Sequence, residues 1–200
     1  MRWGTQKQAI LQVITRPMIP TEIMRKAKGI NPRISFGDTS TLIRGLERRG
    51  IIECITPQQI TGRLYFPTNY GRRLIWRIFN IKVSPIEDSI DWYKYSRLEA
   101  GKTRKLVLKE IYSIKAFYSD GINLTSIRKR VNRTYPLTLS QTFCAVKDIL
   151  TDKLIMVAGY AKKRNSKLYK LTQEGNELCE YILNCEKALV VSQENREHPF

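Results

Sequence analysis

Histidine is nearly absent from this chain, which contains only His198, close to its C-terminal end. A catalytic triad or a histidine-rich metal centre therefore lacks its most common side chain. The four cysteines, Cys54, Cys144, Cys179 and Cys185, show no C-x-x-C spacing. This pattern predicts neither a zinc site nor a disulfide framework, so we expect buried free thiols, no metal and no cofactor.

Nucleotide-binding loops and long apolar runs are also missing. No stretch fits G-x-x-x-x-G-K-[ST] or G-x-G-x-x-G, and runs such as Leu154 to Ala158 are far shorter than the ~20 residues of a membrane-spanning helix. Asp148 and Asp152 are spaced i, i+4, but solvated helix carboxylates are the more common case. No apolar segment typical of a secretory signal follows Met1. We expect a cytoplasmic, nucleoid-associated protein that is not an enzyme.

Positive charge is abundant. Lys and Arg total 35 against 18 Asp and Glu, which gives a net charge of +17. Residues 1–90 hold 15 basic and 6 acidic residues, and residues 91–200 hold 20 and 12, so no single tail carries the excess. A globular chain that is basic throughout usually binds a polyanion, most often nucleic acid. No helix combines a basic face with a large apolar one, so we expect double-stranded DNA and no membrane as the partner.

The sequence contains an internal repeat. The frame L-Y-x-x-T-x-x-G-x-x-L occurs at Leu64–Leu74 and again at Leu168–Leu178, an offset of 104 residues. The same offset pairs Leu42 with Val146, Leu46 with Leu150, Ile51 with Ile155 and Ile23 with Ile127. A frame kept over this length predicts a duplication.

Apolar periodicity and turn residues predict the same element order in both repeats. In the first we expect helices near 5–16, 20–28 and 37–49, strands near 51–55 and 63–67, and a closing helix over 69–81. In the second we expect helices near 101–115, 124–133 and 139–153, strands at 154–159 and 167–171, and a closing helix over 173–189. The predicted domains are 1–81 and 99–189, with a tail at 190–200. The connector 82–98 contains Trp92, Tyr93 and Tyr95, so we expect it to pack on one domain.

Three helices followed by a two-stranded hairpin resemble a winged helix-turn-helix. The stretch from Asp38 to Ile52, with its Leu-Glu-x-x-Gly-hydrophobic ending, is similar to the recognition helix and first wing strand of prokaryotic winged-helix regulators. These include the multiple-antibiotic-resistance, PadR-like and related archaeal families. The resemblance implies an α+β, mainly α fold of two winged helix-turn-helix domains in tandem, each with three helices, a two-stranded wing and a closing helix.

In such a domain the third helix enters the major groove. In the first repeat its inward side is Leu42, Ile43 and Leu46, and its outward side includes Ser40, Thr41, Arg44 and Arg48. Arg44 suits a guanine edge, Ser40 and Thr41 suit bases or phosphate, and Arg48 suits phosphate. The first wing carries one charge, Arg63.

The second repeat looks different under the same offset. Its outward positions become Gln141, Cys144, Ala145, Asp148, Thr151 and Asp152, and two carboxylates facing phosphates weaken binding. Only Ser140, Gln141 and Thr142 suit base contact. The basic side chains lie instead on the second helix and the wing, at Arg128, Lys129, Arg130, Arg133, Lys162, Lys163, Arg164 and Lys167. We therefore predict that repeat one reads sequence and repeat two holds the backbone or minor groove.

The prediction is a double-stranded DNA-binding protein, most simply a transcriptional regulator. Two alternatives stay open. One is an adaptor subunit of a transcription, replication or chromosome-organising complex, which the acidic third helix of repeat two favours. The other is a plasmid-type replication initiator with two winged helices. A homodimer through the closing helices is compatible with each of these functions.

Overall fold

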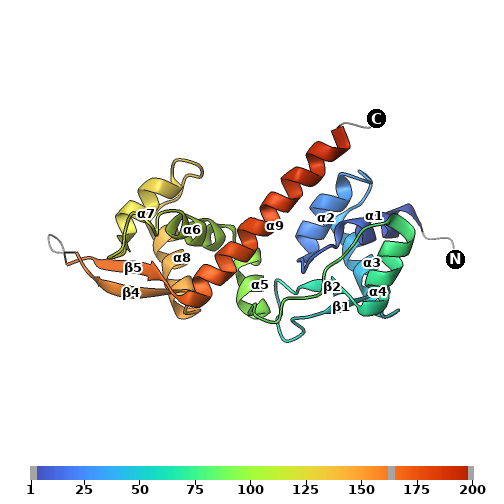
Figure 1. Cartoon of the computed structure of the whole chain (residues 1–200), viewed down its shortest axis with the longest axis horizontal. Helices are drawn as coiled ribbons and strands as arrows, with labels where there is room; N and C mark the ends of the chain where they lie inside the picture. The colour runs from blue at the N-terminus through green and yellow to red at the C-terminus, as the bar shows by residue number, and fades with distance from the viewer. Residues whose placement is uncertain (1–3, 162–164, 198–200) are drawn as a thin grey trace. The chain divides into compact units, whose positions relative to one another are not determined.

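The computed structural model describes the backbone of residues 4–161 and 165–197, and the side chains of 4–161 and 165–186. The predicted contacts at Lys162, Lys163 and Arg164 lie outside these residues. The described chain is mainly helical, with two small antiparallel sheets (Figure 1). It divides into two compact units, unit 1 over residues 1–100 and unit 2 over residues 101–200.

Unit 1 has the element order that the sequence predicts, followed by one additional helix. Its elements are α1 (Thr5–Val13), α2 (Pro20–Lys28), α3 (Phe36–Glu47), β1 (Ile52–Cys54), β2 (Tyr65–Pro67), α4 (Asn69–Phe79) and α5 (Trp92–Ala100). Strands β1 and β2 pair antiparallel, with Ile52 opposite Pro67. The core forms where the apolar stripes of the first three helices meet, at residues such as Ile10, Ile23 and Ile43.

Unit 2 repeats the order from α1 to α4, with one short additional strand before its second helix. Its elements are α6 (Lys102–Ser113), β3 (Ile122–Asn123), α7 (Leu124–Val131), α8 (Leu139–Thr151), β4 (Ile155–Tyr160), β5 (Lys167–Leu171) and α9 (Gln173–Glu197). The strands lie in the order β3-β5-β4, all antiparallel. The register shifts between Val157 and Gly159, as at a β-bulge.

The predicted two-stranded hairpin is present in both units, and each hairpin also has a further partner before the second helix that the sequence did not predict. In unit 2 this partner is β3, where Ile122 pairs with Tyr169. In unit 1 a single bridge joins Met18 to Tyr65. The chain entering the second helix is extended in both units, so its backbone can pair with the hairpin.

The offset between the units is not constant, which corrects the pairing of the third helices. Ile23 and Ile127 are both buried, at the expected offset of 104. The buried positions of the third helices and of the first strands pair at an offset of 103, as Thr39 with Thr142, Ile43 with Val146, Leu46 with Ile149 and Ile51 with Leu154. From Thr68 and Thr172 onward the offset is 104 again. Unit 2 has one residue fewer before its third helix and one more in its hairpin, so the two changes cancel.

The repeated Thr-x-x-Gly frame begins the closing helix. The Thr68 hydroxyl accepts a hydrogen bond from the Gly71 amide at 3.1 Å and donates to the Gly50 carbonyl at 2.7 Å. In unit 2 the Thr172 hydroxyl accepts from Gly175 at 3.1 Å and donates to Lys153 at 2.8 Å. One side chain therefore caps the helix and ties it to the turn before the first strand.

The residues from 82 onward pack on unit 1, where the structure forms helix α5 in place of an irregular connector. Tyr95 and Leu98 are fully buried. The Ser96 hydroxyl donates to the Gly62 carbonyl at 2.6 Å, and the Gln59 amide donates to the Tyr93 carbonyl at 3.0 Å. Helix α5 thereby holds the turn of the first hairpin.

Candidate nucleic-acid interface

Helix α3 begins with a capping box. The Ser35 hydroxyl accepts from the Asp38 amide at 3.1 Å, and the Ser35 amide donates to the Asp38 carboxylate at 3.0 Å. The Ser35 hydroxyl also donates to this carboxylate at 2.6 Å, and this bond, together with the one from the Ser35 amide, lowers the pKa of the Asp38 carboxyl below its usual value. The carboxylate is thus engaged at the helix end.

The exposed face of α3 carries most of the side chains that the sequence predicts. Thr41, Arg44 and Arg48 are exposed, and Ser40 is half-buried. Each arginine lies along the helix, since Arg44 Nε donates to the Ser40 carbonyl and Arg48 Nε to the Arg44 carbonyl, both at 3.4 Å. This face is polar and cationic over about two turns.

Helix α8 begins with the equivalent box. The Thr138 hydroxyl accepts from the Gln141 amide at 3.1 Å, and the Thr138 amide donates to Gln141 Oε1 at 2.9 Å. Ser140 and Gln141 are exposed, as predicted. The amide oxygen of Gln141 is used by the cap, so its amide nitrogen is the group left to face a ligand.

The prediction that Thr142 contacts bases is wrong. It is fully buried, and its hydroxyl donates to the Thr138 carbonyl at 3.0 Å. Ala145, also predicted to face outward, is buried too. An offset of 104 pairs Thr142 with Asp38 and Ala145 with the exposed Thr41, whereas the true equivalent of Thr142 is the buried Thr39.

The predicted acidic face of α8 is also wrong. Asp152 is only 5% exposed, and Asp148 pairs with Arg104 of α6 at 3.4 Å. The offset of 103 places Lys147 where unit 1 has Arg44, and Cys144 where it has Thr41. Both are exposed, so α8 presents a cation and not two carboxylates at the middle of its outer face.

Exposed hydrophobic side chains at the start of both helices were missed by the sequence reading. Phe36 is 52% exposed, and its equivalent Leu139 is 50% exposed. Phe143, at the position of Ser40, is likewise exposed. Aligning the two capping boxes at Ser35 and Thr138 reveals these positions, since each box fixes where its helix starts.

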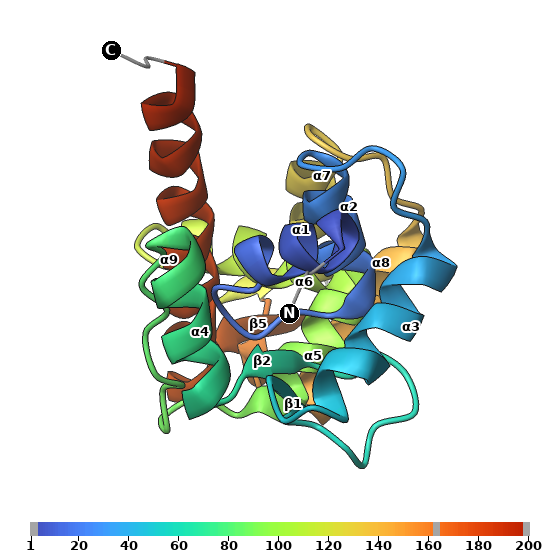
Figure 2. The same ribbon diagram turned by 90° about the vertical axis from the view of Figure 1, so that its right-hand side faces the viewer.

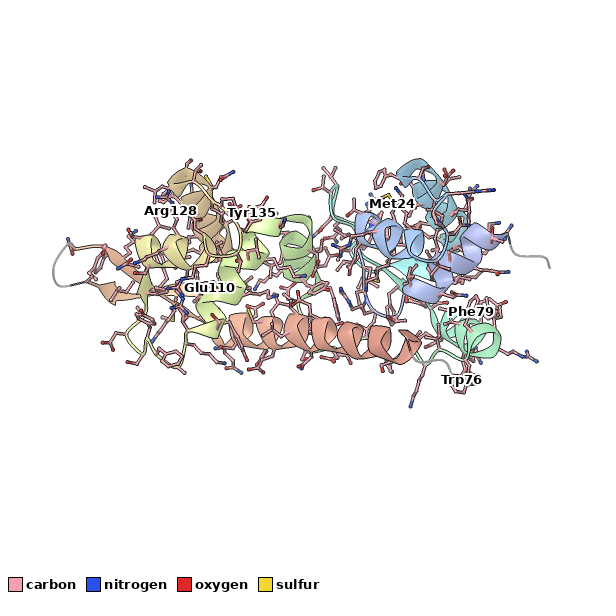
Figure 3. The ribbon with its side chains drawn as sticks, turned by 90° about the horizontal axis from the view of Figure 1, so that it is seen from above. Met24, Trp76, Phe79, Glu110, Arg128 and Tyr135 are labelled. Atoms are coloured by element: carbon pink, nitrogen blue, oxygen red, sulfur yellow. The ribbon has the colours of Figure 1, made fainter. Side chains whose placement is uncertain are left out.

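The cations of α7 divide into two kinds. Arg128 Nε donates to the Leu137 carbonyl at 3.1 Å, and Arg130 Nε lies 2.7 Å from a Glu110 carboxylate oxygen. Figure 3 labels Arg128 of α7 and Glu110 of α6. These two side chains hold α7 to the turn after it and to α6. Lys129 and Arg133 are exposed and remain available for a ligand.

On the hairpins, Arg63 and Lys167 are exposed at the start of the second strand. Arg63 Nε donates to the Gln59 carbonyl at 2.8 Å.

Within the described residues, no group of three or more histidine, cysteine or acidic side chains could hold a metal ion. No helix in that part of the chain is long and apolar enough to cross a membrane.

No protein-family model matches the chain, and no curated protein matches it either. Solved structures with a match include the crystal structure of SSV1 F-93, which is 17% identical. The match covers 44% of this chain and 90% of that one, with a TM-score of 0.30. At that score the likeness supports no conclusion about fold or function.

Proposed function

We propose that this protein binds double-stranded DNA as a tandem winged-helix transcriptional regulator and is not an enzyme. The observation that supports it best is the outer face of α3, where Thr41, Arg44 and Arg48 are exposed on a helix with a capped start. A helix of this kind fits the major groove, where arginine suits guanine edges and phosphates. The net charge of +17 supplies the attraction to a polyanion.

In this proposal unit 2 contributes Lys147, Lys129, Arg133 and Lys167, which are exposed. Lys147 gives α8 a cation at the position of Arg44, so both third helices are suited to DNA. Under this proposal both units can contact bases and backbone, and they differ only in how much each contributes to either contact. Three of the basic wing residues that motivated the division into a reading unit and a holding unit, Lys162, Lys163 and Arg164, lie outside the described residues.

A titration of random-sequence duplex by fluorescence anisotropy between ~50 and 200 mM salt tests the proposal. Replacing Arg44 and Arg48 by Ala should weaken binding and lower the slope of log K against log salt by up to about 2, since each lost phosphate contact removes roughly 0.9. Arg72→Ala/Arg73→Ala removes the same charge from α4, another helix of the same unit, and should have the smaller effect on duplex binding. No binding at ~50 mM salt would refute DNA binding. Equal effects of the two double variants would refute the role of α3.

An adaptor function is the second candidate, on different grounds from those the sequence suggested. Helix α8 does not have the predicted acidic outer face, but its side chains Leu139 and Phe143 are apolar and exposed. Large exposed apolar residues near one another are typical of protein-contact surfaces. A Leu139→Ser/Phe143→Ser variant that binds duplex like the wild type but loses a protein partner would favour this candidate.

A further inference from the structure

Unit 1 has a second basic surface, on α4. A cavity of about 710 Å³ is lined by Asn69, Arg72, Arg73, Trp76, Arg77, Lys82 and Val83. We name it the α4 groove. Four of its seven lining residues are cationic, and one is the largest aromatic side chain.

The α4 groove lies in a stretch of sequence without acidic residues, since none occurs between Glu53 and Glu87. Arg73, Arg77 and Lys82 are exposed, and within the described residues no ion pair engages them. Four cations gathered without counter-charges repel one another. An anionic ligand would relieve that repulsion.

Trp76 is 53% exposed, although its neighbour Ile75 is fully buried in the core. Helix α4 thus buries one side and leaves the indole in solvent beside the arginines. A tryptophan face that is open to solvent can stack on a flat ring, and nucleic-acid bases stack on such side chains irrespective of sequence.

The groove is separate from the α3 face. In Figure 2, α3 and α4 lie on opposite sides of unit 1, with α1 between them. Figure 3 likewise places Trp76 on the side away from Met24 of α2. A duplex lying along α3 would therefore leave the α4 groove open.

Two other occupants fit the groove less well. A second copy docked through the same face would bring like charges together, which opposes a symmetric dimer here. A paired and stacked base in a duplex does not offer its ring to an indole. An unpaired strand offers both phosphates for the cations and free base faces for Trp76.

We propose that the α4 groove binds single-stranded nucleic acid, with a base stacked on Trp76 and phosphates held by Arg73, Arg77 and Lys82. The site would act without sequence preference. It does not depend on duplex binding by α3, because the two surfaces use different residues.

The test measures binding of the full chain to a labelled oligothymidine of about 12 nucleotides by anisotropy. Trp76→Ala should weaken binding at least about fivefold, the lower limit for loss of one stacked base, whereas Trp76→Phe should keep most of the affinity. Arg73→Glu/Arg77→Glu should weaken it further. Arg25→Glu/Lys28→Glu on α2 changes the net charge equally and should have the smaller effect.

Arg44→Ala/Arg48→Ala should leave oligothymidine binding unchanged, so failure of duplex binding and failure of this site give different results. Wild-type affinity in Trp76→Ala, with the fold checked by circular dichroism, would overturn the proposal. So would equal losses in the two charge-reversed variants. Trp76-dependent binding to phosphatidylserine vesicles without oligothymidine binding would assign the groove to a membrane surface instead.

Discussion

Gly71 and Gly175 explain why the repeated frame contains a glycine. A Cβ atom at Gly71 would lie 1.9 Å from the Ile51 carbonyl oxygen, and one at Gly175 would lie 2.0 Å from the Leu154 oxygen. In both units the closing helix therefore packs so closely against the residue just before the hairpin's first strand that no side chain fits between them. The hydroxyls of Thr68 and Thr172 tie the same helix ends to the turn before the first strand. The Thr-x-x-Gly frame therefore has the same structural role in both units.

Either glycine replaced by alanine should lower the free energy of unfolding by about 2–3 kcal/mol, because the backbone must shift to admit the methyl group. Urea unfolding measures the change. Gly45 of α3 is the matched control, since a Cβ there meets nothing within 4 Å. Gly45→Ala should be neutral or stabilise by up to about 1 kcal/mol. A Gly71→Ala protein as stable as Gly45→Ala would contradict this account of the frame.

The cysteines differ in accessibility, against the expectation that all four are buried. Cys144 is exposed on α8, and Cys179 is buried in α9. Burial raises the pKa of the Cys179 thiol to about 12. In a reaction with a thiol reagent at about pH 8, Cys144→Ser should remove the fastest phase and Cys179→Ser should leave it unchanged. A fast phase that survives Cys144→Ser would refute the placement of that residue.

The raised pKa also predicts a pH dependence. A group whose pKa is higher in the folded than in the unfolded state stabilises the fold below the unfolded value, and this contribution is lost as the pH rises. For Cys179 the window begins near 9.0, its ordinary value, and extends to about 12. Wild type should thus lose more stability across that window than Cys179→Ala, measured by urea unfolding at both ends. Parallel losses would count against burial of this thiol.

At the scale of elements, the third helices share a design that the constant offset concealed. Each starts with a capping box, exposes an apolar side chain at its first residue, and carries a cation two turns later, at Arg44 in α3 and Lys147 in α8. They differ at the positions between, where α3 has Ser40 and Thr41 and α8 has Phe143 and Cys144. If both helices bind DNA as proposed, these positions would make them suit different bases.

If α3 enters the major groove, Phe36 at its tip can contact the C5-methyl group of thymine. Uracil in place of the contacted thymine should weaken wild-type binding about 3–10-fold, because it removes that methyl group alone. The same replacement should not affect Phe36→Ala, and uracil elsewhere in the site should affect neither protein. A double-mutant cycle on a selected binding sequence measures this coupling. Zero coupling would exclude the contact.

At the scale of the whole chain, two compact units divide the molecule after Ala100. Unit 1 includes α5, whose buried Tyr95 and Leu98 complete its core. We therefore expect residues 1–100 and 101–200 to fold separately, each with a cooperative thermal transition.

A fragment of residues 1–81 should be less stable than 1–100, by several degrees or more in Tm, because it loses the apolar surface that α5 buries. Circular dichroism melting of the three fragments checks both expectations. Equal melting temperatures for 1–81 and 1–100 would show that α5 contributes nothing to the unit.

Local sequence was sufficient to predict the three helices, the hairpin and the closing helix of each unit, with most of their bounds. It did not predict α5 or β3, and it ended the closing helix of unit 2 at residue 189 with a tail beyond it, whereas α9 continues to Glu197. Apolar periodicity, helix caps and turn residues act over a few positions, so they can be recognised without knowledge of the fold. The duplication was visible for the same reason, in the Leu64–Leu74 and Leu168–Leu178 frames. The charge of +17 likewise requires no structure.

Tertiary structure decided which residues of that pattern face solvent. One residue lost before α8 and one gained in the hairpin restore the offset at both ends, so the sequence comparison alone could not detect the shift between them. Packing of α8 on the core then buried Thr142 and Asp152 and exposed Phe143 and Lys147. Because one position turns a helix by about 100°, an error of a single residue was enough to move the predicted interface to the wrong side.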